Sequence, residues 1–148
     1  MSEQFNILLV EDNLDDVMLL RRAFARAHVL NPLIRVEDGA QAIDYLCGIG
    51  VYADRKKYPL PFLVLTDLMM PKVSGLELIQ WIRERKEFAD ITIVTLTSND
   101  DFACIAEAHR LGADSYLVKP GGSEQLFEML QRFQGYWLMT NRRPNQVA

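Results

Sequence analysis

The sequence predicts an α/β protein in which five β-strands and five helices alternate, (βα)5, around one parallel sheet. Two observations lead to this prediction: five short apolar runs recur along the 148-residue chain, and segments with helical periodicity lie between them. Short, continuously apolar runs are typical of parallel strands that are covered on both faces. Because crossovers between parallel strands are right-handed, helices are expected on both faces, which makes the sheet doubly wound.

The predicted strands share an apolar run that ends at a polar or turn-forming residue. They cover about Phe5–Val10, Leu33–Val36, Phe62–Thr66, Ile91–Leu96 and Tyr116–Val118. The chain is near the common size of one domain, and a hydrophobic content of 49% suffices to fill one core. We therefore expect a single compact domain.

Two of the predicted helices begin with recognisable caps. Asn13 can cap the first helix, and Asp15 and Asp16 lie in its first turn, where the helix dipole favours negative charge. Ser74 and Glu77 have the spacing of a capping box at the start of the third helix. The apolar residues of both helices recur at helical spacing and predict their inner faces: Val17, Leu20, Phe24 and Ala27, and Leu76, Ile79 and Ile82.

The other three helices are marked by turns and by glycine. Asp38-Gly39 makes the turn into the second helix, and the fourth runs from about Asp100 to Leu111, where Gly112 ends it. Ser123 opens the last helix. A long loop, Gly48–Pro61, separates the second helix from the third strand. The apolar residues of the second and last helices are Ala42, Ile43 and Leu46, and Leu126, Leu130, Phe133 and Trp137.

Charge and cysteine content narrow the class of protein. The net charge of −4 argues against a nucleic-acid-binding surface, which is usually basic. The only cysteines, Cys47 and Cys104, form neither a disulfide framework nor a zinc-ligand spacing, as expected of reduced thiols in a cytosol. No apolar stretch approaches the length of a membrane span, and no signal segment precedes the first strand. We expect a soluble cytoplasmic protein that binds neither nucleic acid nor membranes.

Five polar residues stand where four of the predicted strands end. Glu11 and Asp12 follow the first strand, Asp67 the third, Thr97 the fourth and Lys119 the fifth. In open α/β sheets, ligands bind outside the carboxyl ends of the strands. A single acid at such a position is more often a turn former or a helix cap, so each residue alone is weak evidence. Their coincidence predicts a site of three carboxylates, a hydroxyl and an ammonium group.

The chemistry of these five groups indicates phosphoryl transfer. Carboxylates held close together repel one another, and Mg²⁺ relieves the repulsion while keeping waters that phosphate oxygens can displace. Asp67 is the candidate nucleophile, because a carboxylate can accept a phosphoryl group as an aspartyl phosphate. Mg²⁺, the Lys119 ammonium and the Thr97 hydroxyl would each bind one phosphoryl oxygen.

The segments that carry these residues resemble the receiver domain of two-component response regulators. The resemblance spans about Phe5–Phe133 and implies a flavodoxin-like sheet with the strand order 2-1-3-4-5. It implies a signalling protein that accepts a phosphoryl group from a histidine kinase and assists its own phosphorylation and dephosphorylation, rather than an enzyme. The motifs are Leu8-Leu9-Val10-Glu11-Asp12-Asn13, Val64-Leu65-Thr66-Asp67-Leu68-Met69-Met70-Pro71 with Gly75, Leu96-Thr97-Ser98, and Tyr116-Leu117-Val118-Lys119-Pro120.

Residue by residue, the resemblance implies a phosphoacceptor and a metal site. Asp67 would become the 4-aspartylphosphate, and Asp12 would be a direct Mg²⁺ ligand. Glu11 would hold the metal mainly through water, and the main-chain carbonyl of Met69 would complete the protein ligands. Many receivers carry a polar residue at the position of Met69, so the rate of dephosphorylation is left open.

The resemblance also implies a switch. Thr97 and Lys119 would contact the phosphoryl group as catalytic residues, and Tyr116 would occupy the position of the aromatic switch residue. A Thr97 hydroxyl drawn toward the phosphoryl group would vacate space for the Tyr116 ring. The signal would then leave through altered protein–protein contacts.

The expected receiver domain covers residues 1–135, followed by a C-terminal extension, 136–148. Gly48–Pro61 and this extension resemble the single-domain regulators of bacterial phytochrome-type histidine kinases, so such a kinase is an expected partner. A histidine phosphotransfer protein is a further candidate partner. The four consecutive apolar residues Tyr136-Trp137-Leu138-Met139 cannot all face one core from a helix, so they predict a homodimer contact.

Two alternative functions are compatible with parts of the pattern. One is a small-molecule phosphohydrolase or phosphotransferase that forms an aspartyl phosphate, but such enzymes need an acid two residues after the nucleophile, where this chain has Met69. The other is a degenerate receiver that is not phosphorylated, against which the complete set of site residues argues. The sequence identifies neither the stimulus, nor the downstream target, nor the direction of phosphate flow.

Overall fold

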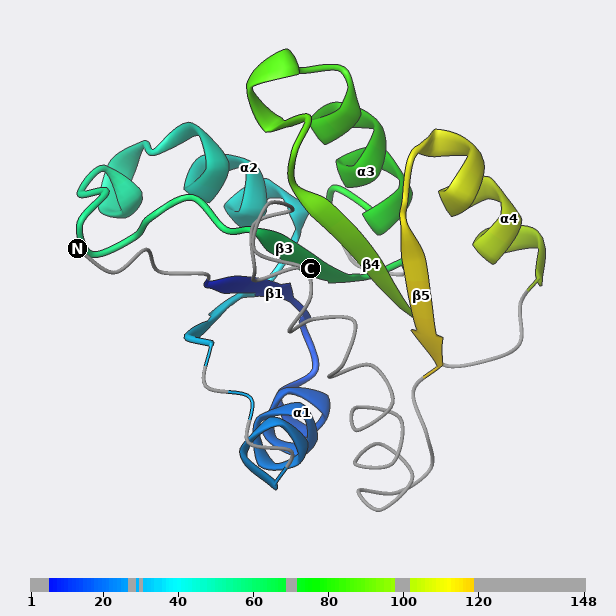
Figure 1. Cartoon of the computed structure of the whole chain (residues 1–148), viewed down its shortest axis with the longest axis horizontal. Helices are drawn as coiled ribbons and strands as arrows, with labels where there is room; N and C mark the ends of the chain where they lie inside the picture. Colours follow the sequence, from blue (N-terminus) through cyan, green and yellow to red (C-terminus); the bar gives the residue numbers. More distant parts are fainter. Residues whose placement is uncertain (1–5, 27–28, 30, 69–71, 98–101, 119–148) are drawn as a thin grey trace, which may run out of the picture.

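Five parallel strands form the centre of the computed structural model, which describes residues 6–26, 29, 31–68, 72–97 and 102–118. Their order is β2-β1-β3-β4-β5, and every neighbouring pair is parallel (Figure 1). The predicted flavodoxin-like order is therefore confirmed, and the predicted carboxyl ends of the strands agree to within one residue. The strands are β1 (Ile7–Val10), β2 (Leu33–Val36), β3 (Leu63–Asp67), β4 (Thr92–Thr97) and β5 (Ser115–Val118).

The helices alternate with the strands, as predicted. Within the described residues they are α1 (Leu14–Arg26), α2 (Gly39–Cys47), α3 (Gly75–Arg83) and α4 (Phe102–Leu111), with two short 3₁₀ turns, η1 (Gly50–Tyr52) and η2 (Lys86–Phe88). The last predicted helix, opened by Ser123, lies outside the described residues.

The predicted caps are present. The Asn13 side chain accepts a hydrogen bond from the Asp16 amide at 3.1 Å, and thereby caps α1. Ser74 and Glu77 form the complete capping box of α3, in which each side chain accepts from the other residue's amide. The α1 cap fixes the entry of the chain into the helix that follows the carboxyl end of β1, and the α3 capping box fixes the start of the helix that follows the loop after β3.

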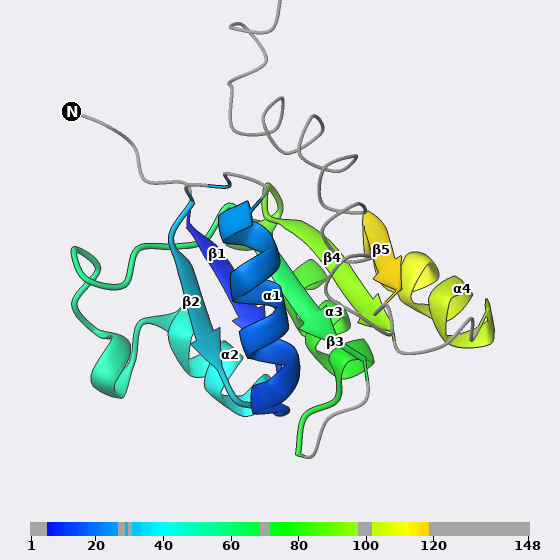
Figure 2. The ribbon, with the colours of Figure 1, turned by 90° about the horizontal axis from the view of Figure 1, so that it is seen from below.

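The helices cover both faces of the sheet, which makes it doubly wound. α1 lies on one face, and α2, α3 and α4 lie on the other (Figure 2). Side chains alternate along β1, so Ile7 and Leu9 pack toward α1, whereas Leu8 and Val10 pack toward α2 and α3. This alternation divides the core into two layers separated by the sheet.

The prediction that the strands are buried on both faces is confirmed for the central strands and wrong for the edge strands. Every residue of β1 is fully buried. Tyr116 of β5 is 42% exposed, and Arg35 of β2 is half-buried. The physical reason is position: an edge strand has a neighbour on one side only, so the helices cover it less completely.

The long loop Gly48–Pro61 packs against α2 instead of projecting into solvent. Tyr45 of α2 and Tyr52 and Tyr58 of the loop form a cluster with ring centroids 5.1–5.9 Å apart. The guanidinium of Arg55 donates hydrogen bonds to the last main-chain carbonyls of α2 at 2.7 and 2.6 Å. The Tyr45 carbonyl also accepts from the amide of Gly48, the left-handed C-cap, at 3.1 Å, so Gly48 and Arg55 together cap the end of α2.

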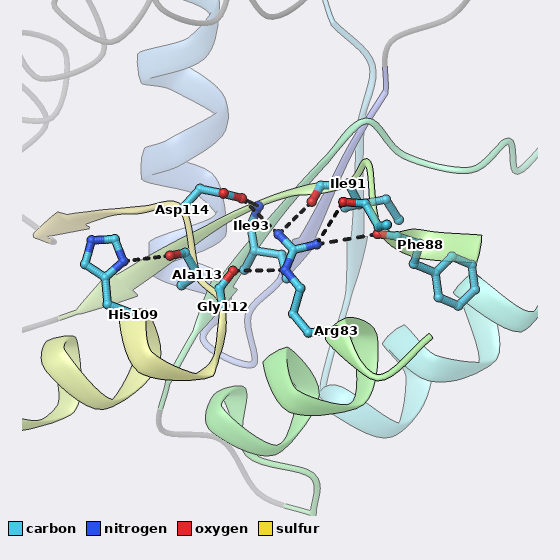
Figure 3. Close-up of polar contacts among 9 residues, drawn as sticks. Arg83, Phe88, Ile91, Ile93, His109, Gly112, Ala113 and Asp114 are labelled. Atoms are coloured by element: carbon cyan, nitrogen blue, oxygen red, sulfur yellow. Dashed lines mark hydrogen bonds and ion pairs between the residues drawn. The ribbon is translucent and has the colours of Figure 1, made fainter. Parts of the chain in front are cut away.

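Arg83, at the end of α3, ties this helix to the segments before β4 and β5 (Figure 3). Its Nε donates to the Gly112 carbonyl at 2.9 Å, and its Nη2 donates to the Ile91 carbonyl at 2.8 Å and to Asp114 at 2.9 Å. The same Asp114 oxygen accepts from the Ile93 amide. This network braces the edge of the sheet opposite to the strand ends that carry the predicted site.

Candidate functional site

The strand register brings the predicted site residues to one edge of the sheet. Thr66 of β3 pairs with Val10 of β1, so the next residues of the two strands, Asp67 and Glu11, lie side by side. Asp67 is in register with the residue of β4 that precedes Thr97. The carboxyl ends of neighbouring strands in the series β1, β3 and β4 therefore differ by one residue each, and all three lie at the edge of the sheet that the sequence predicted.

The three predicted acids form one cluster. Glu11, Asp12 and Asp67 each offer a carboxylate oxygen, and these oxygens lie within 4.8 Å of one another. Glu11 is completely buried, Asp67 is half-buried and Asp12 is exposed. Charges this close repel one another strongly when partly shielded from water. An all-oxygen, anionic set of this kind fits a hard divalent cation such as Mg²⁺ or Mn²⁺.

The main chain around the acid pair is held by hydrogen bonds. The Asn13 amide donates to the Glu11 carboxylate at 3.1 Å. Arg35 of β2 donates from Nε to the Glu11 carbonyl at 2.9 Å and from Nη2 to the Asp12 carbonyl at 3.3 Å. Arg35 is not among the residues predicted from the sequence, although an arginine inside an otherwise apolar strand is a signal that could have found it.

Close packing of α3 against the end of β3 positions Asp67. A Cβ atom added at Gly75 would lie 2.2 Å from the Asp67 carbonyl oxygen, so a side chain at that position would displace the main chain of Asp67. The Gly75 amide donates to the Leu68 carbonyl at 3.0 Å, and the Thr66 hydroxyl donates to the Asp67 carbonyl at 2.9 Å. The glycine of the sequence motif is thus required by the close approach of the two segments.

The remaining predicted site residues are described only in part. Thr97 is the last residue of β4, but its side chain lies outside the described residues, as do Met69 and Lys119. Lys119 directly follows the last residue of β5, which is in register with Thr97. Tyr116 lines a shallow surface depression between β4, β5 and α4, together with Thr95 and His109.

A family profile, the response regulator receiver domain, matches residues 7–131, which include the acid pair, Asp67, Thr97 and Lys119. The chain belongs to the response regulator receiver family. The match covers all five strands of the sheet and confirms the resemblance drawn from the motifs at the strand ends.

Relatives of this receiver cover nearly its whole length. The probable methanogenesis regulatory protein FilR2 of Methanothrix harundinacea is 36% identical over 97% of this chain and 90% of its own. Response regulator Rcp1 of Synechocystis sp. is 31% identical over 97% of this chain and 99% of its own. The structure of its Mn²⁺-bound form covers 93% of this chain and 97% of that chain, with a TM-score of 0.80.

A third relative is known in a phosphorylated form. The structure of the phosphorylated cyanobacterial phytochrome response regulator RcpA matches with a TM-score of 0.84 and 31% identity, and covers 96% of this chain and 99% of that chain. Family membership and fold identify this chain as a receiver of two-component signalling, which accepts a phosphoryl group from a histidine kinase. This is a signalling function rather than the small-molecule phosphohydrolase activity considered as an alternative.

Among the described residues, no helix has both the length and the apolar character needed to cross a membrane.

Proposed function

We propose that Asp67 is the phosphoacceptor of this receiver and that Glu11, Asp12 and Asp67 hold Mg²⁺ beside it. The carboxylate cluster carries this proposal, because three carboxylate oxygens within 4.8 Å of one another repel each other and a divalent cation relieves that repulsion. The Mn²⁺-bound form of Rcp1 supports a divalent metal in a related receiver. The carbonyl of Met69 is proposed as a further ligand, and Glu11 as one that acts mainly through water.

The proposed chemistry is a transfer between two nucleophiles. A carboxylate oxygen of Asp67 attacks the phosphorus of a phosphohistidine, the P–N bond breaks, and the leaving imidazole takes up a proton. The product is an aspartyl phosphate. The metal would neutralise charge on the phosphoryl oxygens, and the Lys119 ammonium and Thr97 hydroxyl are proposed to bind the other oxygens. In this way the receiver assists its own phosphorylation and dephosphorylation.

Conversion of the Asp67 carboxylate to an amide tests whether Asp67 is the phosphoacceptor. Asp67→Asn keeps the shape of the side chain but lacks the nucleophilic carboxylate, so the phosphoryl adduct formed with Mg²⁺ and a small acyl phosphate should vanish from the intact mass. Asp90→Asn is the control, because Asp90 is exposed and precedes β4 at the opposite edge. Normal labelling of Asp67→Asn would refute the assignment.

The same measurement on the unaltered protein separates the alternatives. A stoichiometric adduct that is lost slowly is expected of a receiver. Rapid consumption of the acyl phosphate without an adduct would indicate a phosphohydrolase, and no reaction at all would indicate a degenerate receiver.

We also propose Thr97 and Tyr116 as the switch that transmits phosphorylation. Tyr116 is suited to this role because it is 42% exposed and lines the same surface depression as Thr95. Inward movement of its ring would change the surface of α4 and β5 as a shift between pre-existing states. Addition of a phosphoryl mimic should therefore move the backbone amide resonances of α4 and β5, and shifts confined to residues next to Asp67 would contradict it.

We propose a phytochrome-type histidine kinase as the partner. The name of RcpA and the long loop Gly48–Pro61 support this pairing, whereas the name of FilR2 points to a different pathway. Phosphotransfer from a panel of phytochrome-type and other histidine kinases would test it, with initial rates compared at equal concentrations. A histidine phosphotransfer protein as a second partner, and a cytoplasmic location, stay predictions.

A further inference from the structure

We infer that Arg35 is a positioning residue for the acid pair of the metal site. The inference rests on the proposed function of that site, because it assigns to Arg35 a role in the affinity for the cation. Arg35 contributes no ligand atom to the cluster. It acts through the main chain of Glu11 and Asp12, whose carboxylates are the proposed ligands.

The guanidinium of Arg35 spans two consecutive peptide groups. It reaches from β2 across to the end of β1, where Nε donates to the Glu11 carbonyl at 2.9 Å and Nη2 donates to the Asp12 carbonyl at 3.3 Å. Its Nη1 lies 3.6 Å from a carboxylate oxygen of Glu37, and the side chain is only 17% exposed. A planar fork held at three points has little freedom to move.

These two carbonyls lie where the ladder between β1 and β2 ends. The last main-chain bond between the strands runs from the Glu11 amide to the Val36 carbonyl at 3.1 Å. β2 ends at Val36 and the chain turns into α2, so it supplies no further amide there. Arg35 therefore provides the donors that a longer strand would have provided, and it fixes the backbone direction of the two residues that carry the acids.

The positive charge of Arg35 would have the opposite effect from its hydrogen bonds. A guanidinium close to a cation site repels the cation, so its charge alone would weaken metal binding. Fixing the ligands in place strengthens metal binding, because the cation then does not have to order them. When Arg35 is replaced by a neutral residue, the loss of charge should raise the metal affinity and the loss of the hydrogen bonds should lower it. A substitution can therefore separate the two effects.

The experiment measures Mn²⁺ affinity of the full chain by the electron paramagnetic resonance signal of the free ion, with Mg²⁺ as competitor. Arg35→Gln should lower the affinity roughly tenfold, the lower end of the effects known for groups that orient metal ligands. Arg35→Lys keeps the charge but cannot span both carbonyls, so its affinity should fall between those of Arg35→Gln and the unaltered protein.

Arg21 offers a matched control. It lies on α1 and donates from Nη1 to the Leu33 carbonyl at 3.2 Å, which is the same kind of bond at the other end of β2. Arg21→Gln should leave Mn²⁺ affinity unchanged. Thermal unfolding in chelator, measured for each variant, separates a loss of stability from a loss of metal affinity.

Each outcome decides one question. If the unaltered protein binds no Mn²⁺, the proposed metal site fails, whatever Arg35 does. If it binds Mn²⁺ and Arg35→Gln binds equally or more tightly, or if Arg35→Lys matches the unaltered protein, the positioning role is overturned. If Arg35→Gln does not fold, the comparison of Arg35→Lys with Arg21→Lys decides instead.

Discussion

Three residues of the same charge occupy three different environments at the strand ends. Glu11 is completely buried and accepts from the Asn13 amide, Asp67 is half-buried, and Asp12 is exposed. Burial makes a charged carboxylate costly and restricts its side-chain geometry. An exposed carboxylate can exchange its bound water for a metal ion at little cost. The exposed Asp12 is therefore the acid best placed to bind a cation directly.

Asp12→Ala should weaken Mg²⁺ binding by about tenfold or more, and by more than Glu11→Ala does, because the Glu11 contact is proposed to run through water. The same change removes one of three like charges, so the metal-free protein should become more stable by about 1 kcal/mol. Urea unfolding in chelator and a Mg²⁺ titration would measure the two effects. Asp16→Ala, in the first turn of α1, serves as the control for metal affinity, and equal losses for Asp12→Ala and Glu11→Ala would contradict the ranking.

The hydroxyl of Tyr45 makes the free energy of unfolding depend on pH in the alkaline range. It accepts from the Asn6 side chain at 3.1 Å and donates to the Pro59 carbonyl at 2.8 Å. Burial raises the pKa of Tyr45 from 10.0 to about 12. Between these values the unfolded chain has lost the proton and the folded chain has kept it, so the free energy of unfolding falls as the pH rises.

Tyr45→Phe should remove this contribution, which amounts to roughly 3 kcal/mol over the interval. At neutral pH the variant should be less stable by about 1–2 kcal/mol, because Asn6 and the Pro59 carbonyl lose their partner. Urea unfolding at pH 7 and at several values above pH 10 measures both effects. Tyr116→Phe is the control, since Tyr116 is partly exposed. An unchanged slope above pH 10 in Tyr45→Phe would contradict the assignment.

At the scale of elements, the carboxyl and amino ends of the strands have different roles. The carboxyl ends of the strands carry the acids, whose like charges repel one another. The amino ends of β4 and β5 carry the Arg83 network, which ties α3 to the segments before both strands (Figure 3). The hydrogen bonds at the amino ends of the strands thus offset part of the electrostatic repulsion at their carboxyl ends.

Arg83→Met keeps the apolar stem but removes every donor of the network. The Gly112 and Ile91 carbonyls and Asp114 would lose a charged partner, so we expect destabilisation by about 2–4 kcal/mol in urea unfolding. Arg85→Met is the control, because the Arg85 guanidinium donates to the Trp81 carbonyl of its own helix and packs over the Trp81 ring, so its cost should be smaller. Mg²⁺ affinity should stay unchanged in both variants, and a loss in Arg83→Met would show that the two edges are coupled.

At the scale of the whole molecule, we predict a homodimer formed through the C-terminal extension, 136–148. The four apolar residues from Tyr136 to Met139 support it, although they lie outside the described residues. Light scattering at tens of micromolar should give twice the 17.0 kDa chain mass, since modest interfaces have micromolar affinities. Truncation after Phe133 should halve the mass and leave Asp67 phosphorylatable. A monomeric full chain, with and without a phosphoryl mimic, would contradict the prediction.

The local pattern of the sequence by itself predicted the strands, the caps of α1 and α3 and the clustering of Glu11, Asp12 and Asp67. Each of these depends on neighbours in the chain: an apolar run predicts a strand, and a polar residue at its end predicts a place at the edge of the sheet. The strand order was obtained from the resemblance to receivers. Once that order is given, parallel strands that end at the same edge place Glu11 and Asp67 together.

Only the tertiary structure decided which side chains reach between elements. Arg35 on β2 and Arg83 on α3 bind carbonyls of segments distant in the chain, and Tyr45 is buried by a loop that the sequence only marked as long. The exposure of Tyr116 follows from the edge position of β5. The physical reason is the same in each case. A hydrogen bond between distant segments depends on the packing of whole elements, and no period or spacing along the chain records it.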